Sequence, residues 1–400
     1  MSLNAGGGRF RRATVIGSAT FCGQRKSNSS VLQRIWRPTV WGRGMLMPLP
    51  TEPIGSIPRP TALLTGMQDH AAGRTTDAAL ADLYDAAVQD TIARLESLGS
   101  PVVTDGEQSK PSFVSYPLAG LTNLSPDGAV IPFADGHTRQ LPALSAGPFR
   151  YATFSAQYLQ AARKYATAPV KQAVIAASAM SLLYPANGIS GYSREQFLDD
   201  LVDNVEADIR GAFDCGAHSV QLDFTEGRLS LKLDPSGGLL DSFVALNNRV
   251  LDRFTPEQRQ RIGVHTCPGG DQDSTHSLDV DYAELLPKLF GIHAGQFYVQ
   301  LASEPDPDRV LQVIAEHLPA DARIFVGVID PIDPAVETAE QVRDRVLNAA
   351  RHLPVDRLGT CDDCGFAPFG DDVSTSRETA FAKVRARIEG TAAASEELGV

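Results

Sequence analysis

Short apolar runs alternate with amphipathic helical segments from about residue 53 to the end of the chain. The apolar runs have the length and composition of buried strands, and the segments between them repeat apolar residues at the i, i+3, i+4 spacing of a helix. Eight such runs, each followed by a helix or helical region, are typical of a (β/α)₈ TIM barrel. We therefore predict an α/β fold of this type. The expected strands end near Ser56, Glu107, Ile175, Asp223, Cys267, Gln300, Asp330 and Cys364.

The helical segments expected between these strands are residues 76–98, 194–215, 241–254, 281–291, 307–318, 338–352 and 377–396. Several of them follow a residue suited to capping a helix, namely Ser193, Asp281, Asp306 and Thr338. Such side chains accept hydrogen bonds from the free N–H groups of the first helical turn. The Pro- and Gly-rich stretch 108–168 fits the alternation poorly, so we predict an insertion after the second strand that contains a hairpin.

The first 46 residues differ from the rest of the chain in composition. Residues 1–51 contain eight Lys and Arg and no acidic residue, and they lack the apolar core of a secretory signal. Two interpretations are open: an organellar transit peptide, or a misassigned start, because Met45 and Met47 immediately precede the first expected strand. Under either, we expect residues 1–46 to be disordered and residues 47–400 to form the catalytic barrel.

The net charge of the chain is −12, and beyond residue 51 the imbalance is 28 basic against 48 acidic residues. An acidic body argues against nucleic acid and anionic membranes as partners. No apolar run reaches the roughly 18–20 residues needed to span a bilayer. The five Cys are few and odd in number, which favours a reducing cytoplasm with free or metal-bound thiols. We therefore expect a cytoplasmic protein with small-molecule partners. Assembly into a homo-oligomer is left as an open alternative.

His265 and Cys267 end one apolar run, and Cys364 follows the last one. Residues two apart in a strand point to the same side, so His265 and Cys267 can share one ligand. One imidazole and two thiolates suit Zn²⁺, with a fourth position left for water or substrate. The alternative is a core His with two inert thiols, because free Cys is commonly buried. The strand-end positions favour the zinc site, since active sites of this barrel lie at the C-terminal ends of the strands.

A zinc site of this composition favours thiol chemistry over hydrolysis, because thiolate ligands donate charge and lower the Lewis acidity of the metal. A substrate thiol that coordinates zinc is deprotonated at neutral pH. The resulting sulfur nucleophile can attack an alkyl carbon. The ligand set therefore predicts S-alkylation.

Charged residues near two strand ends are candidates for substrate binding. Glu107 and Asp223 could hold a substrate ammonium or hydroxyl group, or they could pair with nearby Lys110, Arg228 or Lys232. The same three cations are candidates for binding an anionic substrate group.

Two further residues are the predicted catalytic groups. Asp330 is a candidate proton carrier, with a capped strand end as the alternative, and His276 lies in a polar, Gly-containing loop after the metal pair, where it can touch substrate. Gln300 follows a strand beside the metal; because an amide oxygen is a weak zinc donor, we expect it to support the site rather than to bind the metal. Cys361 is expected to be a bystander, since no second C-x-x-C exists.

From about residue 50 to residue 396, the chain resembles the catalytic barrel of cobalamin-independent methionine synthase. The matching pieces are I-G-S at Ile54–Ser56, D-G-E at Asp105–Glu107, Q-L-D at Gln221–Asp223, H-T-C at His265–Cys267 and D-C-G at Asp363–Gly365. The resemblance implies zinc bound by His265, Cys267 and Cys364. Gln300 takes the position of a zinc-side Glu in that family, which is a departure from its pattern.

The resemblance also implies a thiol substrate held by the Ile54–Ser56 segment, with Glu107 and Asp223 near its amino group. Longer stretches are similar to the epoxyalkane:coenzyme M transferase branch, including T-E-P-I-G-S-I-P-R-P, D-G-E-Q-S-K-P-S-F and D-F-T-E-G-R-L-S-L-K-L-D-P-S. That branch implies a thiol that carries a sulfonate, for which Lys110, Arg228 and Lys232 would be the cations.

Three interpretations follow. The favoured one is attack of the coenzyme M thiolate, bound to zinc, on an epoxyalkane to give a 2-hydroxyalkyl thioether. The alternative is transfer of a methyl group from a methyltetrahydrofolate-type donor to homocysteine. The third is a non-catalytic barrel in which zinc only ties the strands together.

Overall fold

The structure, a computed structural model, describes residues 48–400. The prediction for residues 1–46 lies outside these described residues. Within the described part of the chain, no helix is both long and apolar enough to cross a lipid bilayer.

A six-stranded parallel sheet forms the centre of the fold. Its strand order, β12-β11-β10-β7-β6-β5, follows the order of these strands along the chain, so each one lies beside its predecessor. Most of the strand residues are buried, as expected for a parallel sheet that is covered on both faces. The strands are β5 (Lys171–Ile175), β6 (Ser219–Asp223), β7 (Ile262–Thr266), β10 (Gln296–Val299), β11 (Arg323–Ile329) and β12 (Leu358–Asp362).

The first two expected strands contribute only single parallel bridges at the two edges of this sheet. Thr51 pairs with Thr360 of β12, and Val103 pairs with Val170, the residue before β5. The segment T-E-P-I-G-S-I-P-R-P contains Pro residues, which cannot donate to a ladder of hydrogen bonds. The sequence thus predicted eight strands, and six of them form as continuous strands in the described chain.

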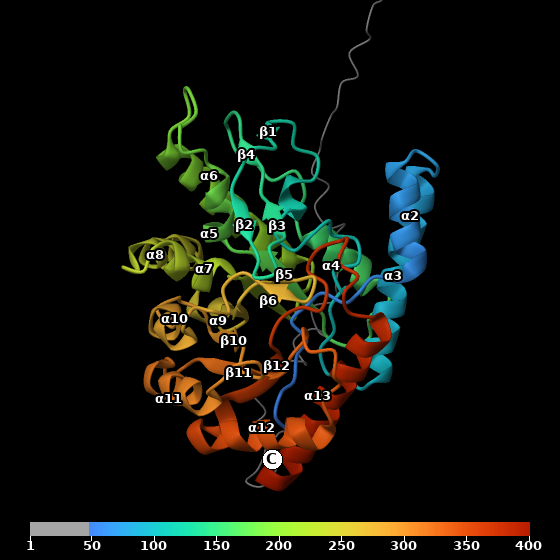
Figure 1. Cartoon of the computed structure of the whole chain (residues 1–400), viewed down its shortest axis with the longest axis vertical. Helices are drawn as coiled ribbons and strands as arrows, with labels where there is room; N and C mark the ends of the chain where they lie inside the picture. Colours follow the sequence, from blue (N-terminus) through green and yellow to red (C-terminus); the bar gives the residue numbers. More distant parts are fainter. Residues whose placement is uncertain (1–47) are drawn as a thin grey trace, which may run out of the picture. The chain divides into compact units, whose positions relative to one another are not determined.

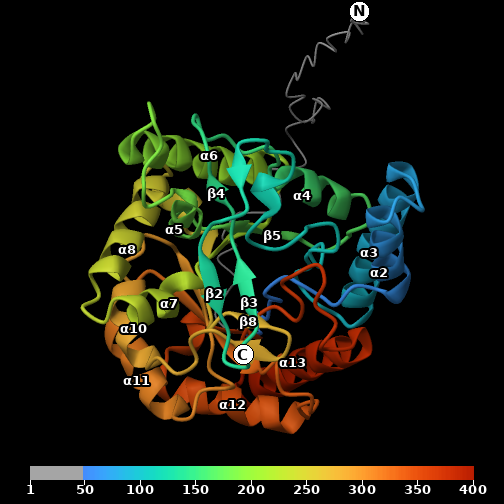
Figure 2. The ribbon, with the colours of Figure 1, turned by 45° about the horizontal axis from the view of Figure 1, so that its top comes forward.

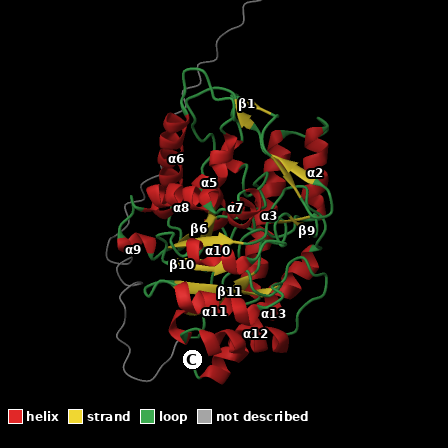
Figure 3. Cartoon of the chain, turned by 60° about the vertical axis from the view of Figure 1, so that its left-hand side comes forward, coloured by secondary structure: helices red, strands yellow, loops and turns green. Residues whose placement is uncertain are grey.

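Helices cover the outside of the sheet (Figure 1, Figure 2), and the strands lie between them (Figure 3). All seven predicted helical segments are present, with ends within a few residues of the predicted ones. The longer helices are α2 (Thr61–Ala71), α3 (Asp77–Ser97), α4 (Ala156–Arg163), α6 (Arg194–Asp214), α7 (Glu226–Leu233), α8 (Gly238–Leu251), α10 (Tyr282–Leu289), α11 (Pro307–His317), α12 (Ala339–His352) and α13 (Arg377–Leu398). The shortest helices are α5 (Ala177–Met180) and α9 (Pro256–Arg259).

The predicted capping residues begin their helices. Ser193 and Gln196 form a reciprocal capping box at the start of α6, and Thr338 and Gln341 form another at α12. The side chain of Asp281 accepts a backbone hydrogen bond at the start of α10. These local signals explain why the helix starts could be predicted without tertiary information.

The stretch 108–168 contains two short antiparallel strand pairs. β1 (Leu124–Ser125) pairs with β4 (Ala143–Leu144), and β2 (Val130–Pro132) pairs with β3 (Thr138–Gln140). The tip of the β2–β3 hairpin contacts the loop after β7, where Ala134 N–H donates to the carbonyl of Thr275 at 2.9 Å. Figure 2 shows this hairpin over the sheet, close to β8 (Gly270–Asp271). The hairpin therefore forms a wall above the end of β7.

Candidate metal centre and active-site cavity

His265, Cys267 and Cys364 meet at the carboxyl ends of β7 and β12. One potential ligand atom from each residue lies within 4.8 Å of the other two, and all three side chains are buried. The two sulfur atoms are 2.9 Å apart, and both Cys are free thiols. We call these three residues the metal triad. Its members come from sequence positions that the strand pattern had already placed at one edge of the sheet.

The metal triad fits zinc by the chemistry of its donors. Both ring nitrogens of His265 are buried without a hydrogen-bond partner in the described chain, although buried polar atoms are normally satisfied. A hydrogen bond from Cys267 lowers the pKa of Cys364 well below its ordinary value, while burial raises the pKa of Cys267. No fourth His, Cys, Asp or Glu of residues 48–400 joins this cluster. One imidazole and two sulfurs with an open position match a catalytic zinc site.

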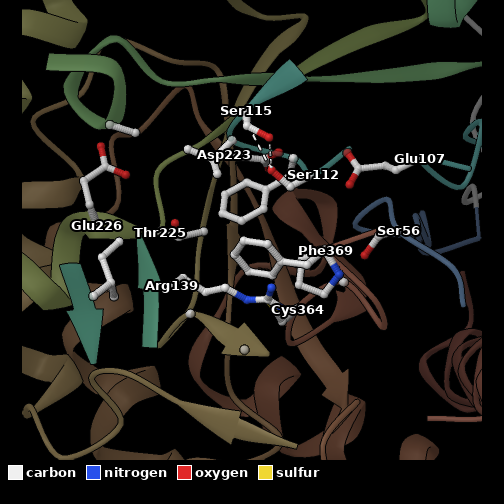
Figure 4. A pocket seen from close by; sticks show the side chains of 18 of the residues that line it. Ser56, Glu107, Ser112, Ser115, Arg139, Asp223, Thr225, Glu226, Cys364 and Phe369 are labelled. Carbon is white, nitrogen blue, oxygen red and sulfur yellow. Dashed lines mark hydrogen bonds between the residues drawn. The ribbon is translucent and has the colours of Figure 1, made fainter. Parts of the chain in front are cut away.

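A cavity of about 450 Å³ opens beside the metal triad. Figure 4 shows acidic and hydroxyl side chains around it, together with Arg139 and the ring of Phe369 near Cys364. Much of the remaining wall is apolar. The apolar residues include Met67, Phe113, Ile131, Phe133, Leu141, Leu182, Leu229 and Phe369. A cavity of this kind, mainly apolar with a few polar groups, is typical of a small-molecule site.

The Ile54–Ser56 segment lines the cavity, and its conformation is held from two sides. Thr104 Oγ1 donates to the carbonyl of Gly55 at 2.9 Å, and Ser56 Oγ accepts from the N–H of Ala367 at 3.2 Å. A side chain at Gly365 would not fit, because an added Cβ would lie 2.2 Å from Ser56 Oγ. Ser56 is thus packed directly against the loop that carries Cys364.

Glu107 lines the cavity in a left-handed backbone conformation, with a φ of 56°. Such a conformation is strained for a residue with a side chain, and such residues cluster at functional sites. Its Oε1 accepts a hydrogen bond from Lys110 Nζ at 2.9 Å, and both side chains are buried. Burial opposes the charge of Lys110, but the carboxylates of Glu107, Asp105 and Asp223 together outweigh it and raise the pKa of Lys110. Lys110 is therefore the partner of Glu107 and does not itself line the cavity.

Asp223, the last residue of β6, is the second carboxyl group of the cavity wall. Its Oδ1 accepts from Gln221 Nε2 at 2.8 Å. Burial and, after it, the charge of Glu107 raise the pKa of Asp223 to about 6. A bound cation would therefore stabilise the charged form of Asp223.

Arg228 and Lys232 do not line the cavity in the described structure. The guanidinium of Arg228 donates to Glu304 Oε1 at 2.7 Å and to Gln300 Oε1 at 3.1 Å, and also to two backbone carbonyls. The ammonium of Lys232 donates to Asp279 and to the carbonyl of His276. Both cations are thus engaged with the protein itself.

Gln300 is buried between two partners and is not part of the cavity wall. Its Oε1 accepts from Arg228, and its Nε2 donates to Ser303 Oγ at 2.8 Å. No hydrogen bond joins it to the metal triad among the described contacts. The amide therefore links β10 to the buried Arg228 ion pair.

The two predicted catalytic residues differ in their access to the cavity. His276 lines it, with Nδ1 2.9 Å from Ser277 Oγ, and burial lowers the pKa of His276 to about 4. Asp330 lies outside it; its Oδ1 accepts from the N–H of Ile332 at 2.9 Å. This contact, just after β11, corresponds to the alternative interpretation of Asp330 as a capped strand end.

Sequence reasoning missed three charged residues of the cavity wall, Arg139, Glu226 and Asp371. Arg139 comes from β3, and its guanidinium bonds Asp271 and Asp371. No local signal in the insertion indicated this pairing. Glu226 stands three residues after Asp223 in D-F-T-E-G-R, so its proximity to a strand end was a usable signal.

Comparisons with known proteins identify relatives of this chain. The family model described as the catalytic domain of cobalamin-independent synthase matches residues 49–386. A methionine synthase of Saccharolobus solfataricus is 23% identical over 355 residues, which is 88% of this chain and 96% of that protein. The protein YxjH of Bacillus subtilis is 23% identical over 366 residues, 86% of this chain and 93% of that protein.

Solved structures share the fold. A B12-independent methionine synthase from a Shewanella species, in complex with selenomethionine, superposes with a TM-score of 0.70 at 20% identity, covering 88% of this chain and 99% of that one. A Listeria monocytogenes structure described as a putative vitamin-B12 independent methionine synthase gives 0.65 at 19% identity, with 87% and 98% covered.

Proposed function

This chain belongs to the family of the cobalamin-independent synthase catalytic domain, and we propose that it transfers a methyl group to the sulfur of an amino thiol, with homocysteine as the first candidate. The observation that carries the proposal is the charge of the cavity wall. Of the carboxyl groups that line it, Glu107 and Asp223 suit a substrate ammonium, and Arg139 is the one Lys or Arg among the described lining residues. Arg139 is already paired with two carboxylates.

We propose that the metal triad holds zinc. Zinc bound there would lower the pKa of a substrate thiol and so supply a sulfur nucleophile at neutral pH. The donor chemistry of the triad and the unpartnered nitrogens of His265 support this assignment. Family membership supports it as well.

The chain's own residues would orient the thiol substrate. The Ile54–Ser56 segment packs against the loop of Cys364, so it can hold the substrate close to the metal triad. Glu107 is held in place by its ion pair with Lys110, and Asp223 would be held in its charged form by the substrate ammonium. Charge-assisted hydrogen bonds of this kind contribute about 1.5–3 kcal/mol each.

His276 is proposed to contact the alkyl donor, because it lines the same cavity and its lowered pKa keeps the imidazole neutral at pH 7. We do not extend a catalytic role to Asp330, since its side chain lies outside the cavity wall.

Attack of coenzyme M on an epoxyalkane is the second candidate. One observation favours it: much of the cavity wall is apolar, which suits a small epoxide. The three cations expected to hold the sulfonate, however, are committed elsewhere: Lys110 to Glu107, Arg228 to Glu304 and Lys232 to Asp279. Methyl transfer to an amino thiol therefore ranks first.

We also propose that the described residues form one (β/α)₈ barrel with 108–168 as an insertion. The six-stranded sheet and the two bridged edge segments together make eight parallel positions. Two contacts join the edge segments to each other: Ile57 N–H donates to the carbonyl of Gly106 at 3.0 Å, and Thr104 Oγ1 donates to that of Gly55 at 2.9 Å.

The test compares two thiol and donor pairs on zinc-loaded protein. The first pair is homocysteine with methyltetrahydrofolate, assayed as mono- and triglutamate, and the second is coenzyme M with epoxypropane. Formation of methionine from the first pair, with little thiol consumption in the second, is the expected result. Epoxide-dependent loss of coenzyme M without methionine formation would reverse the ranking.

A further inference from the structure

The carboxyl group of Glu226 has no part in the reaction as described so far. Glu226 is the first residue of α7, is buried, and lines the cavity. In Figure 4, Glu226 and Thr225 lie on one side of the pocket, and Ser56 and Glu107 lie on the opposite side. Its Oε2 has no hydrogen-bond partner in the described chain. A buried, unpaired carboxylate is costly, so a group in this position favours its neutral form.

A chain of hydrogen bonds determines which oxygen of Glu226 is the acceptor. The N–H of Ser178 donates to Asn247 Oδ1 at 3.2 Å, which fixes the orientation of that amide. Asn247 Nδ2 then donates to Ser178 Oγ at 2.8 Å, so the Ser178 hydroxyl gives its own proton to Glu226 Oε1. Because Oε1 accepts this bond, the acidic proton of Glu226 resides on Oε2, the atom without a partner.

The surroundings of Glu226 keep that proton in place at neutral pH. Burial, together with the charge of Asp223, raises the pKa of Glu226 to about 8, against the opposing hydrogen bonds from Ser178 and from the backbone of Glu226 and Ala179. Asp223 on β6 is the charged neighbour, whereas Ser178 on α5 and Asn247 on α8 are neutral. Effective general acids have a pKa near the working pH.

We propose that Glu226 is the general acid that protonates the leaving nitrogen of the methyl donor. This inference rests on the proposed methyl transfer. The methyltetrahydrofolate-type donor of that transfer is a tertiary N-methyl amine. Without a proton, such an amine would have to leave as an amide anion, which is a very poor leaving group.

The step balances in atoms and electrons. A bond forms between the thiol sulfur and the methyl carbon, and the bond between that carbon and the donor nitrogen breaks. The electron pair left on nitrogen takes the proton of Glu226 Oε2, which gives a secondary amine and a carboxylate. The proton that the thiol released on ionisation returns through solvent to Glu226, so the net reaction converts a thiol and an N-methyl amine to a methyl thioether and a secondary amine.

The experiment compares Glu226→Gln with wild-type protein, both loaded with zinc, using homocysteine and two donors. Methyltetrahydrofolate needs a proton on its leaving nitrogen, whereas methyl iodide releases iodide, which needs none. We expect a loss of about 100-fold or more in kcat with methyltetrahydrofolate, the size typical of a lost general acid. Methyl transfer from methyl iodide should change less than threefold. Equal losses with both donors, or no loss with either, would overturn the role of Glu226.

A second measurement uses wild-type protein alone, so it does not depend on folding of the variant. We take the ratio of the rate with methyltetrahydrofolate to the rate with methyl iodide. Ionisation of the thiol affects both rates equally and cancels, so the ratio follows the protonation state of Glu226. This ratio should be level below pH 7 and fall above about pH 8. A ratio that stays level from pH 6 to 10 would overturn the inference. If wild-type protein takes a methyl group from methyl iodide and from no N-methyl amine, the proposed function itself fails, and the role of Glu226 fails with it.

Discussion

Replacing Arg228 by Met tests whether this cation supports the fold or binds substrate. The side chains of Arg228 and Glu304 are only 1% and 6% exposed and are joined at 2.7 Å. Two backbone carbonyls and Gln300 also accept from the guanidinium. Met occupies a similar volume but leaves the Glu304 carboxylate buried without its counter-charge.

Removal of one partner of a buried ion pair typically costs about 3–5 kcal/mol, because the remaining charge is uncompensated. We therefore expect Arg228→Met to lower the free energy of unfolding by about that amount, measured by urea denaturation of zinc-loaded protein. The double variant Arg228→Met with Glu304→Gln should recover at least about 1 kcal/mol of the loss, since it removes the stranded charge.

Lys232→Met is the matched control. Lys232 pairs with Asp279, but these side chains are 41% and 66% exposed, and such surface pairs contribute about 0–1 kcal/mol. Lys232→Met should therefore leave the unfolding free energy nearly unchanged. An Arg228→Met protein that is as stable as the Lys232 variant, and that shows a tenfold higher requirement for coenzyme M, would refute the structural role of Arg228 and restore the sulfonate hypothesis.

Three further outcomes are expected. Cys364→Ser should lose most of the bound zinc and all thiol alkylation, whereas Cys361→Ser should keep both, as measured by metal analysis and product formation; the reverse pattern would show that the ligands are misassigned. Gly269→Ala should lower activity at least about tenfold with zinc retained, because an added Cβ would lie 1.7 Å from Nε2 of His276. The φ of 72° at this position also costs about 1–3 kcal/mol for a residue with a side chain. Unchanged kinetics would show that the position of His276 is unimportant. Asp223→Asn should raise KM for homocysteine about tenfold or more, because one charge-assisted hydrogen bond to the ammonium is lost. The KM for a thiol without the amino group should be unaltered. Equal effects on both thiols would argue against contact between Asp223 and the ammonium.

The order of elements could be predicted because each signal is local. The capping boxes at Ser193 and Thr338 involve residues three apart, and the apolar periods identify one face of each helix. The two segments that failed to form strands show the limit of this reasoning. Pro residues and the left-handed turn at Gly106 and Glu107 restrict those segments to single bridges, although their apolar runs resemble strands.

The metal triad could also be predicted, since His265 and Cys267 share one side of β7 and the end of β12 lies at the same edge of the parallel sheet. The cations could not be assigned in this way. Arg228 and Lys232 lie close to Asp223 in sequence, which suggested a site for an anionic substrate, yet each finds its partner on a segment far along the chain.

The sequence by itself therefore determined the alternation of strands and helices, the starts of the helices and the donors of the metal triad, because periodicity, capping and strand ends are properties of neighbouring residues. Only the tertiary structure decided which charges face the cavity. Arg228 pairs with Glu304, and Arg139 pairs with Asp271 and Asp371, through contacts between residues 76 or more positions apart. The hairpin wall and the unpartnered oxygen of Glu226 arise in the same way, since burial and pairing depend on which distant segments the fold brings together.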